Sequence, residues 1–169
     1  MGRLPVSRNG FEFDHPALTE GREIWALIEE IGTLERNTPY AYLLFARYFR
    51  ETVIVARRDG RLQGFVLGFR PPDQPDTVFV WQVGVAPSAR GKGLGRLLLD
   101  VLIEAQPADV RFMEATVTPE NAASEALFRS IGTLHGANVA VSDGFGPDLF
   151  PGSGHERERL FRIGPFAAA

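Results

Sequence analysis

The sequence predicts an α/β fold in which a mixed, twisted sheet carries helices on both faces, giving three layers. Short runs rich in Val, Ile and Phe alternate with longer segments whose apolar residues recur every three or four positions. The 169 residues, 44% of them hydrophobic and 23% charged, suit one soluble domain with a substantial core. The expected order is a strand, two helices, three strands, a helix, a strand, a helix and closing strands.

Strands are predicted where β-branched and aromatic residues cluster between turn signals. Asp59-Gly60 is a strong hairpin turn between two of them. The predicted strands are residues 11–13, 52–56, 62–69, 77–85, 110–117, 139–141 and 160–163. In the strand 77–85, alternation is expected to place four apolar side chains on one face, those of Phe79, Trp81, Val83 and Val85.

Four helices are predicted from apolar periodicity and from residues that begin or end helices. One covers residues 24–31 and ends at Gly32, and the next runs to Phe49 after Thr38-Pro39 as cap and first position. Thr118-Pro119 repeats that signal and predicts a helix start, with an end near Gly132. The remaining helix, 94–105, presents a core-facing stripe of Leu94, Leu97, Leu98, Val101, Leu102 and Ala105 and is ended by Pro107.

The chain is expected to form a single domain over residues 11–166. Residues 1–10 lack periodicity and predict a flexible N-terminus, and residues 167–169 form a short Ala-rich tail. The Gly-, Pro- and Asp-rich segment 142–155 is long enough to be a functional loop.

Composition excludes several classes of function. The absence of cysteine rules out disulfides, thiol nucleophiles and thiolate metal sites, and the His residues lack the clustered carboxylates of a metal site. A net charge of −3 gives no reason to expect nucleic acid or an acidic membrane surface as partner. No apolar run is long enough to cross a bilayer and no signal peptide opens the sequence, so a cytoplasmic protein is expected.

The stretch 80–99 predicts an anion-binding loop. An apolar strand turns at Pro87 and crosses a glycine-rich segment containing Arg90 and Lys92, and a helix begins at Leu94. Unpaired N–H groups at a helix start attract anions, and glycines allow several of them to point at one ligand. The agreement of strand, basic loop and helix favours a diphosphate site over a plain turn. Neither a Gly-Lys-Ser/Thr loop nor a Gly-x-Gly-x-x-Gly dinucleotide motif is present.

This pattern, Arg90-x-x-Gly93-x-Gly95 after Val83-Gly84-Val85-x-Pro87, resembles the acetyl-CoA signature of the GNAT acyltransferase superfamily. The resemblance implies that the loop amides bind the diphosphate of acetyl-CoA and that the preceding strand bonds the pantetheine arm. It extends to the strand 114–117 and the segment after it, where many members carry a Tyr at the position of Phe128. The implied cofactor-binding residues are Val83, Gly84, Val85, Arg90, Gly91, Lys92, Gly93, Leu94, Gly95, Arg96, Asn121, Ser124 and Phe128.

Several blocks are similar, more narrowly, to the family of L-2,4-diaminobutyrate N-acetyltransferases of ectoine biosynthesis. They are residues 33–44, 68–72, 80–83, 114–121, 128–130, 149–152, 155–156 and 162–165. This similarity implies transfer of acetyl to the side-chain N4 amine, a small diamine as substrate, no metal, and a homodimer. The family has Asp at the position of Glu35 and Ser at that of Thr38, which leaves the exact acceptor amine open.

The chemistry requires an acceptor for the proton of the amine and a donor for the thioester oxygen, which a strand amide near 83–85 could supply. Glu114, His155 and Glu156 are the candidate catalytic residues. Glu114 is expected to share a face with Phe112 and Thr116, and a buried acid there must be employed. The candidate acceptor-binding residues are Glu35, Asn37, Tyr40, Trp81 and Thr116. Solvated charges, helix capping and core packing are the alternative roles of these residues.

Two other functions remain open at this point. The chain could acetylate another small amine or a protein N-terminus, or it could be a non-catalytic acyl-CoA-binding sensor. In an enzyme, the amine is expected to attack the thioester directly, because no cysteine is present to carry the acetyl group.

Overall fold

The structure, a computed structural model, describes residues 4–152 and 154–167. Its contacts divide the chain into a first unit, residues 1–69 and 81–107, and a second unit, residues 70–80 and 108–169. The strands pair in the order β1-β2-β3-β4-β5-β6-β8-β7, and β5 (Thr77–Val85) contributes residues to both units. Residues 1–3 of the predicted flexible segment and 168–169 of the predicted tail lie outside the described residues.

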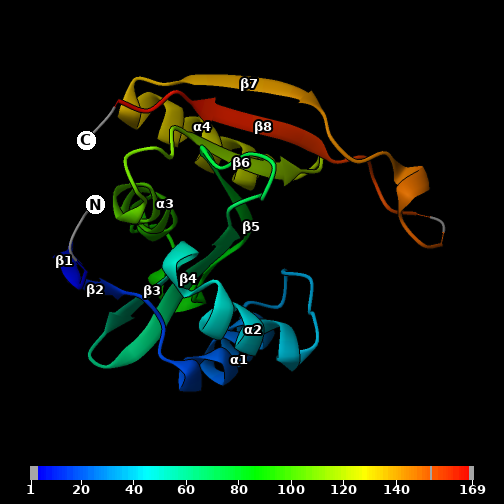
Figure 1. The fold of residues 1–169 in the computed structure, drawn as a ribbon. Helices are drawn as coiled ribbons and strands as arrows, with labels where there is room; N and C mark the ends of the chain where they lie inside the picture. The colour runs from blue at the N-terminus through cyan, green and yellow to red at the C-terminus, as the bar shows by residue number, and fades with distance from the viewer. Residues whose placement is uncertain (1–3, 153, 168–169) are drawn as a thin grey trace. The chain divides into compact units, whose positions relative to one another are not determined.

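The first unit joins an antiparallel group of strands to three helices (Figure 1). Neighbouring strands pair antiparallel from β1 to β4, and the β3–β4 hairpin turns at Asp59 and Gly60, whose φ angles are 52° and 73°. The turn residues therefore adopt the left-handed conformation that a tight hairpin requires. Besides the end of β5, the elements are β1 (Val6–Arg8), β2 (Phe11–Asp14), α1 (Gly21–Ile31), α2 (Pro39–Tyr48), β3 (Val53–Arg58), β4 (Arg61–Phe69) and α3 (Leu94–Ala105).

Helices α1 and α3 pack on opposite faces of β4. A Cβ atom added at Gly64 would meet Leu94 and Leu98 of α3, whereas the next residue, Phe65, lies 2.5 Å from the position of a Cβ at Gly84, which also meets Ile31 of α1. Adjacent residues of a strand point to opposite faces, so both faces are covered. The core between these layers is completely buried at β3 residues 53–56 and β4 residues 65–67.

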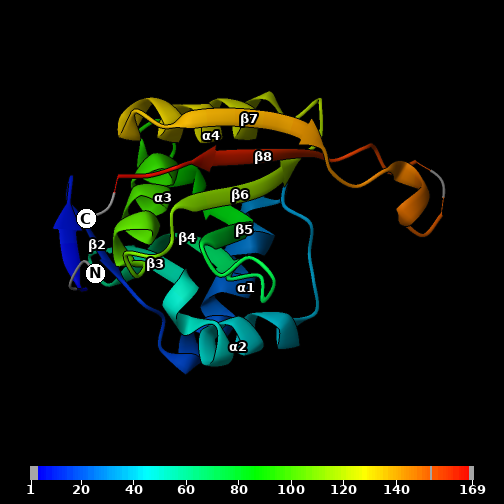
Figure 2. The same cartoon turned by 45° about the horizontal axis from the view of Figure 1, so that its top comes forward.

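The second unit contains the first residues of β5, β6 (Phe112–Val117), α4 (Ala122–His135), β7 (Asn138–Asp143) and β8 (Arg159–Gly164). β5 and β6 are parallel, whereas β6–β8 and β8–β7 are antiparallel. Both views show α4 running alongside these strands (Figure 2). Apolar side chains at every second position of β6 and β8 are buried, together with two side chains of α4. These residues are Met113, Ala115 and Val117 of β6, Phe161 and Ile163 of β8, and Phe128 and Ile131 of α4.

Most predicted elements are confirmed, and α3 and β5 have the predicted bounds. Within the segment 1–10, which was predicted to be flexible, residues 6–8 form β1 against β2, and Arg8 is paired to Asp100 and Glu104 at 2.8 and 2.5 Å. Sequence periodicity could not detect this strand, because three residues are too few to show a period. On α3, Leu99 is buried and Leu97 is only half-buried, so the buried stripe is wider than predicted.

The predicted bounds of the last helix are wrong at both ends. Thr118-Pro119 does not begin α4; Asn121 is the N-cap, and its Oδ1 accepts a hydrogen bond from the Ser124 N–H at 3.1 Å. The helix continues past Gly132 to His135 and ends at Gly136, whose φ is 58°. Gly132 lies inside the helix, and only a glycine fits there because Val139 of β7 lies 2.3 Å from where a Cβ would be.

Thr38 precedes α2 as predicted, but its side chain makes no capping hydrogen bond. Within the described ranges, no helix combines the length and apolar character needed to cross a bilayer.

Candidate functional site

The predicted anion-binding loop lies in the first unit, between β5 and α3. Gly91 and Gly93 have φ angles of 73° and 72°, and Gly93 is the N-cap of α3. A Cβ at either glycine would meet no atom within 4 Å, so glycine is required here for its backbone conformation and not for space. The Leu97 N–H bonds to the Gly93 carbonyl at 3.1 Å, which begins the helical ladder. The N–H groups of residues 94–96 precede that bond and have no acceptor within the helix.

The loop presents positive charge beside these N–H groups. Arg90 and Lys92 are exposed, and the Lys92 ammonium donates to the Ser88 carbonyl at 2.9 Å. The helix dipole adds a partial positive charge at the same terminus. This combination fits a diphosphate, which needs several backbone donors and nearby cations.

The strand that leads into this loop is closely packed. Gly84 has no room for a side chain, because a Cβ would lie 2.5 Å from the Phe65 ring and 2.9 Å from Ile31. The Ala86 N–H bonds to the Gln63 carbonyl at 2.8 Å, and Val83 and Val85 are half-buried. The end of β5 is therefore held firmly at the point where the loop begins.

Among the predicted acceptor-binding residues of the first unit, Trp81 packs against aromatic residues of α2. Its ring stacks on Phe45 at 4.8 Å with 9° between the planes and lies 6.3 Å from the ring of Tyr42. Trp81 is half-buried, so it both packs against α2 and keeps part of its surface accessible. Tyr40, at the start of α2, is 66% exposed, and the Glu35 side chain is exposed.

Two residues that the sequence did not single out connect this group. Gln82 Nε2 donates to the Glu35 carbonyl at 2.8 Å, and the Tyr42 hydroxyl donates to Gln82 Oε1 at 3.4 Å. The Asn37 N–H donates in turn to the Tyr42 oxygen at 3.3 Å, and the Tyr42 side chain is completely buried. The sequence signal for Gln82 was a lone amide inside an otherwise apolar strand.

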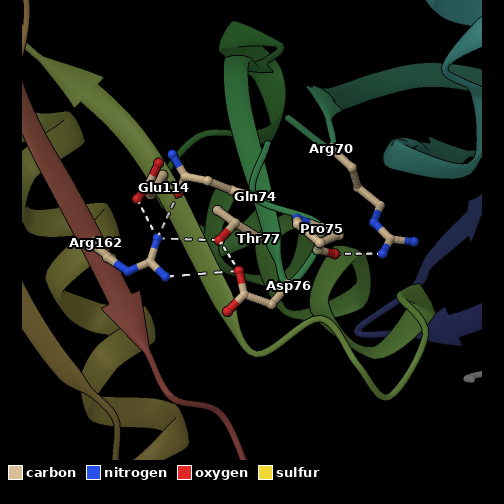
Figure 3. A network of polar contacts seen from close by, with 7 residues as sticks. All are labelled: Arg70, Gln74, Pro75, Asp76, Thr77, Glu114 and Arg162. Atoms are coloured by element: carbon tan, nitrogen blue, oxygen red, sulfur yellow. Dashed lines mark hydrogen bonds and ion pairs between the residues drawn. The ribbon is translucent and has the colours of Figure 1, made fainter. Parts of the chain in front are cut away.

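In the second unit, Glu114 is buried and ion-paired. It is 6% exposed, and its Oε1 accepts a hydrogen bond from Arg162 Nη1 at 2.5 Å. Figure 3 shows the guanidinium among Glu114, Gln74, Asp76 and Thr77. Arg162 Nη1 also donates to Gln74 Oε1 at 3.1 Å and to Thr77 Oγ1 at 3.2 Å. The buried Glu114 carboxylate therefore has an ion-pair partner, as expected of a buried acid. The sequence did not identify Arg162 as that partner.

This polar network lies on the face of β6 opposite to the buried apolar residues. Glu114 pairs in register with Arg162 of β8, and Thr116 pairs with Leu160. The Arg162 guanidinium also lies 3.9 Å from the centre of the Phe112 ring. Glu114 therefore shares a face with Phe112 and Thr116, as the alternation of the strand predicted.

The residues expected to contact the cofactor from α4 have structural roles in this chain. Asn121 caps the helix through Ser124, as described above. The Phe128 ring is only 3% exposed and belongs to the core of the second unit. A contribution of these three residues to acetyl-CoA binding stays a prediction.

His155 and Glu156 lie in the segment between β7 and β8. His155 is exposed, and its ring stacks on Phe150 with 3.5 Å between centroids. His155 Nδ1 lies 2.7 Å from the Glu156 carbonyl; since a carbonyl only accepts, this nitrogen carries the proton, and in the neutral ring Nε2 is left as an acceptor. Neither residue takes part in the Arg162 network within the described chain.

The Glu156 carboxyl has a raised pKa. Burial is the largest cause, and the charge of Glu120 and a hydrogen bond with it act in the same direction, whereas the charge of His155 opposes them. The opposite holds at Glu125, where hydrogen bonds from Arg129 and Arg159 lower the pKa of the carboxyl. Glu156 is therefore the stronger base of these two acids.

No group of three or more His, Asp or Glu side chains in the described ranges is arranged to hold a metal ion. The expectation that the reaction needs no metal stays a prediction.

Comparison with known proteins agrees with this arrangement of strand, glycine loop and helix. Residues 21–133 match the acetyltransferase (GNAT) family. The ribosomal-protein-S18-alanine N-acetyltransferase from Escherichia coli shares the fold, with a TM-score of 0.67 at 18% identity over 94% of this chain and 96% of that one. The chain belongs to the GNAT family of acetyltransferases, and its predicted fold class is confirmed.

Within that family, the chain groups with the L-2,4-diaminobutyric acid acetyltransferases. It is 46% identical to the enzyme of Marinococcus halophilus over 155 residues, which are 91% of this chain and 90% of that protein. The diaminobutyrate acetyltransferase EctA from Paenibacillus lautus, solved with L-2,4-diaminobutyric acid and coenzyme A, has a TM-score of 0.87. Its sequence identity is 40%, covering 94% of this chain and 97% of that one.

Proposed function

We propose that this protein transfers the acetyl group of acetyl-CoA to the N4 amine of L-2,4-diaminobutyrate, a step of ectoine biosynthesis. The observation that carries this proposal is its similarity, over nearly the whole chain, to an acetyltransferase solved with that diamine and coenzyme A. The glycine loop before α3, with its exposed cations, supports acetyl-CoA as the acetyl donor. The products are the N4-acetyl compound and coenzyme A.

Residues 90–96 bind the diphosphate of acetyl-CoA in this proposal, and β5 residues 83–85 bond the pantetheine arm. The N–H groups at the start of α3 supply hydrogen bonds, and Arg90 and Lys92 supply charge. Glu35, Asn37, Tyr40, Trp81 and Thr116 bind the diamine. A carboxylate such as Glu35 attracts the ammonium group that does not react.

We propose Glu156 as the general base, because its electrostatic surroundings suit that role. The reacting amine is protonated at neutral pH and must lose a proton before it attacks. A carboxylate whose pKa is raised accepts that proton more readily than an ordinary one. Glu114 is less suited, because its carboxylate already accepts a hydrogen bond from the Arg162 guanidinium. We assign Glu114 a positioning and electrostatic role and His155 a supporting role beside Glu156.

The transfer itself is a direct attack. The neutral nitrogen forms a bond to the thioester carbon, and a strand amide of residues 83–85 donates to the oxygen as negative charge develops on it. The C–S bond then breaks and the nitrogen loses its remaining extra proton. The thiol of coenzyme A has a pKa of about 8.5, so the thiolate is a tolerable leaving group without a Tyr at position 128.

We further propose a cytoplasmic homodimer. The reaction consumes acetyl-CoA, a metabolite of the cytoplasm. The edge strand β7 and the segment that follows it expose Val141, Phe145 and Leu149, which are 39%, 50% and 66% exposed. Apolar side chains on an unpaired edge favour contact with a second chain. Light scattering coupled to gel filtration tests the dimer, and a monomeric mass at micromolar concentration would contradict it.

The activity is tested by acetyl-CoA turnover with diaminobutyrate, ornithine, lysine and aminoglycosides. We expect the highest kcat/KM with diaminobutyrate and acetylation at N4, identified by NMR of the product. Preference for ornithine or another amine would replace the proposed acceptor. Binding of acetyl-CoA without turnover of any amine would instead favour the acyl-CoA sensor.

A further inference from the structure

We infer that Gln82 determines acceptor specificity, by fixing the backbone of residues 35–37 against β5. The inference rests on the proposed function for its substrate, but its structural part concerns only contacts within the first unit. Residues 33–37 connect the C-cap of α1 to the N-cap of α2 without regular structure, so no helical or sheet ladder holds their backbone. Their position must come from other hydrogen bonds.

Gln82 makes the shorter of two side-chain hydrogen bonds to the backbone of this segment, while the Arg36 side chain pairs with Glu29 of α1 at 2.5 Å. Its Nε2 donates to the Glu35 carbonyl at 2.8 Å, while its Oε1 accepts from the Tyr42 hydroxyl at 3.4 Å. Tyr42 is completely buried, and its oxygen accepts the Asn37 N–H at 3.3 Å. One carboxamide thus connects two backbone positions of the segment, one directly and one through Tyr42.

Only a carboxamide of this length meets both requirements. The Glu35 carbonyl needs a donor and the Tyr42 hydroxyl needs an acceptor, and a glutamine presents both groups at one end of its side chain. A glutamate would present an oxygen to the carbonyl, and a leucine would satisfy neither group. The neighbouring residue, Trp81, is held by stacking on Phe45, so β5 offers a fixed base for the segment.

A fixed segment explains discrimination between diamines that differ by one methylene. Diaminobutyrate and ornithine carry the same groups, and only the distance between the two ammonium groups changes. A pocket with rigid walls separates such homologues by about 10- to 200-fold, and a pocket whose wall can move separates them less. If Gln82 holds the backbone that carries Glu35 and Asn37, its loss reduces this selectivity more than it reduces turnover.

The test compares Q82L and Q82E with the parent enzyme, using the ratio of kcat/KM for diaminobutyrate to that for ornithine. We expect the ratio to fall by about 3- to 10-fold in both variants, through a higher KM for diaminobutyrate. The KM for acetyl-CoA is expected to change by less than about 2-fold, because the 90–96 loop is untouched. The ratio does not depend on the fraction of enzyme that is folded.

Two further variants separate positioning from stability. I54V shortens a completely buried side chain of β3 and is expected to lower the melting temperature while leaving the ratio unchanged. Y42F removes the hydroxyl oxygen that accepts the Asn37 N–H, and Q82L leaves that bond in place. The double variant Y42F/Q82L is therefore expected to have a lower ratio than Q82L alone. A Q82L enzyme with a lower melting temperature and an unchanged ratio would reduce Gln82 to a structural residue.

Hydrogen exchange of the peptide covering residues 33–38 tests the structural part without any substrate. The Asn37 N–H, which bonds to the Tyr42 oxygen, is the amide to follow in this peptide. We expect its exchange to become at least about 5-fold faster in Q82L than in I54V, since the segment opens more often once Gln82 no longer holds it. Unchanged exchange would overturn the inference. If the parent enzyme fails to acetylate diaminobutyrate, the proposed function fails, and the exchange result still decides whether Gln82 positions the segment.

Discussion

Arg162 lies directly opposite Glu114 in the antiparallel β6–β8 ladder and donates a hydrogen bond to its carboxylate at 2.5 Å. The partners come from strands that are 48 positions apart in the sequence. The guanidinium also reaches Gln74 and Thr77, so residues before and within β5 are joined to β8 (Figure 3). A buried acid of the second unit thereby has a guanidinium as its partner.

Replacing Arg162 by Gln is expected to destabilise the protein by about 1–3 kcal/mol, because it leaves the Glu114 charge buried without its partner. This expected loss of stability is smaller than that for breaking a fully buried ion pair, because the Arg162 side chain is 32% exposed. Urea unfolding of R162Q, E114Q and the double variant measures it. We expect the double variant to be more stable than R162Q; a loss equal to the sum of the single losses would show that the two residues act independently.

Activity is expected to fall at acidic pH as the proposed base, Glu156, becomes protonated. Its pKa is raised partly by Glu120, so removing that charge in E120Q lowers the pKa. The base then stays deprotonated to lower pH, and the acidic limb of the kcat/KM profile shifts toward lower pH. D148N, which removes an exposed carboxylate from the same segment, is the control. An E120Q profile that coincides with the parent profile would remove Glu156 as the base.

Lys92→Glu is expected to weaken acetyl-CoA binding by about 10-fold, because it reverses an exposed charge beside the N–H groups that precede α3. Isothermal titration calorimetry at low and high salt measures the effect, which should shrink as salt rises. R61E makes the same change in net charge at the β3–β4 hairpin and is expected to bind normally. Equal losses in the two variants would indicate a general charge effect and no local role for Lys92.

Gly84→Ala is expected to destabilise the first unit by about 2–3 kcal/mol, because its Cβ would lie 2.5 Å from the Phe65 ring. The control is G60A, whose Cβ meets nothing within 4 Å but whose φ of 73° costs about 1 kcal/mol. Thermal unfolding compares the two. If the new Cβ destabilises G84A by clashing with the Phe65 ring, F65L/G84A is expected to be more stable than G84A. The reverse order of stability would contradict this explanation.

Much of this protein could be predicted from the sequence because the relevant signals are local. Apolar periodicity predicts α3 and β5, and Asp59-Gly60 predicts the β3–β4 hairpin. Each of these signals depends only on residues that are close in the sequence. The glycine loop is a local signal as well, because the φ angles of Gly91 and Gly93 and the start of α3 are properties of consecutive residues.

The misplaced start of α4 shows where such signals compete. Thr118-Pro119 and Asn121 both resemble helix starts, and the hydrogen bond from the Ser124 N–H to Asn121 decides between them. Strand β1 was missed for a different reason, because its three residues form a strand only by pairing with β2.

The sequence by itself determined the fold class, the glycine loop before α3 and the kinds of residue proposed as catalytic groups. Only the tertiary structure decided that Arg162 pairs with Glu114, that Glu120 raises the pKa of Glu156, and that Gln82 holds the Glu35 carbonyl. These contacts join residues 36 to 48 positions apart, and nothing in the local pattern of either partner specifies the other. Backbone conformation is encoded by neighbours in sequence, whereas the partners of a buried charge or an irregular backbone are chosen by packing.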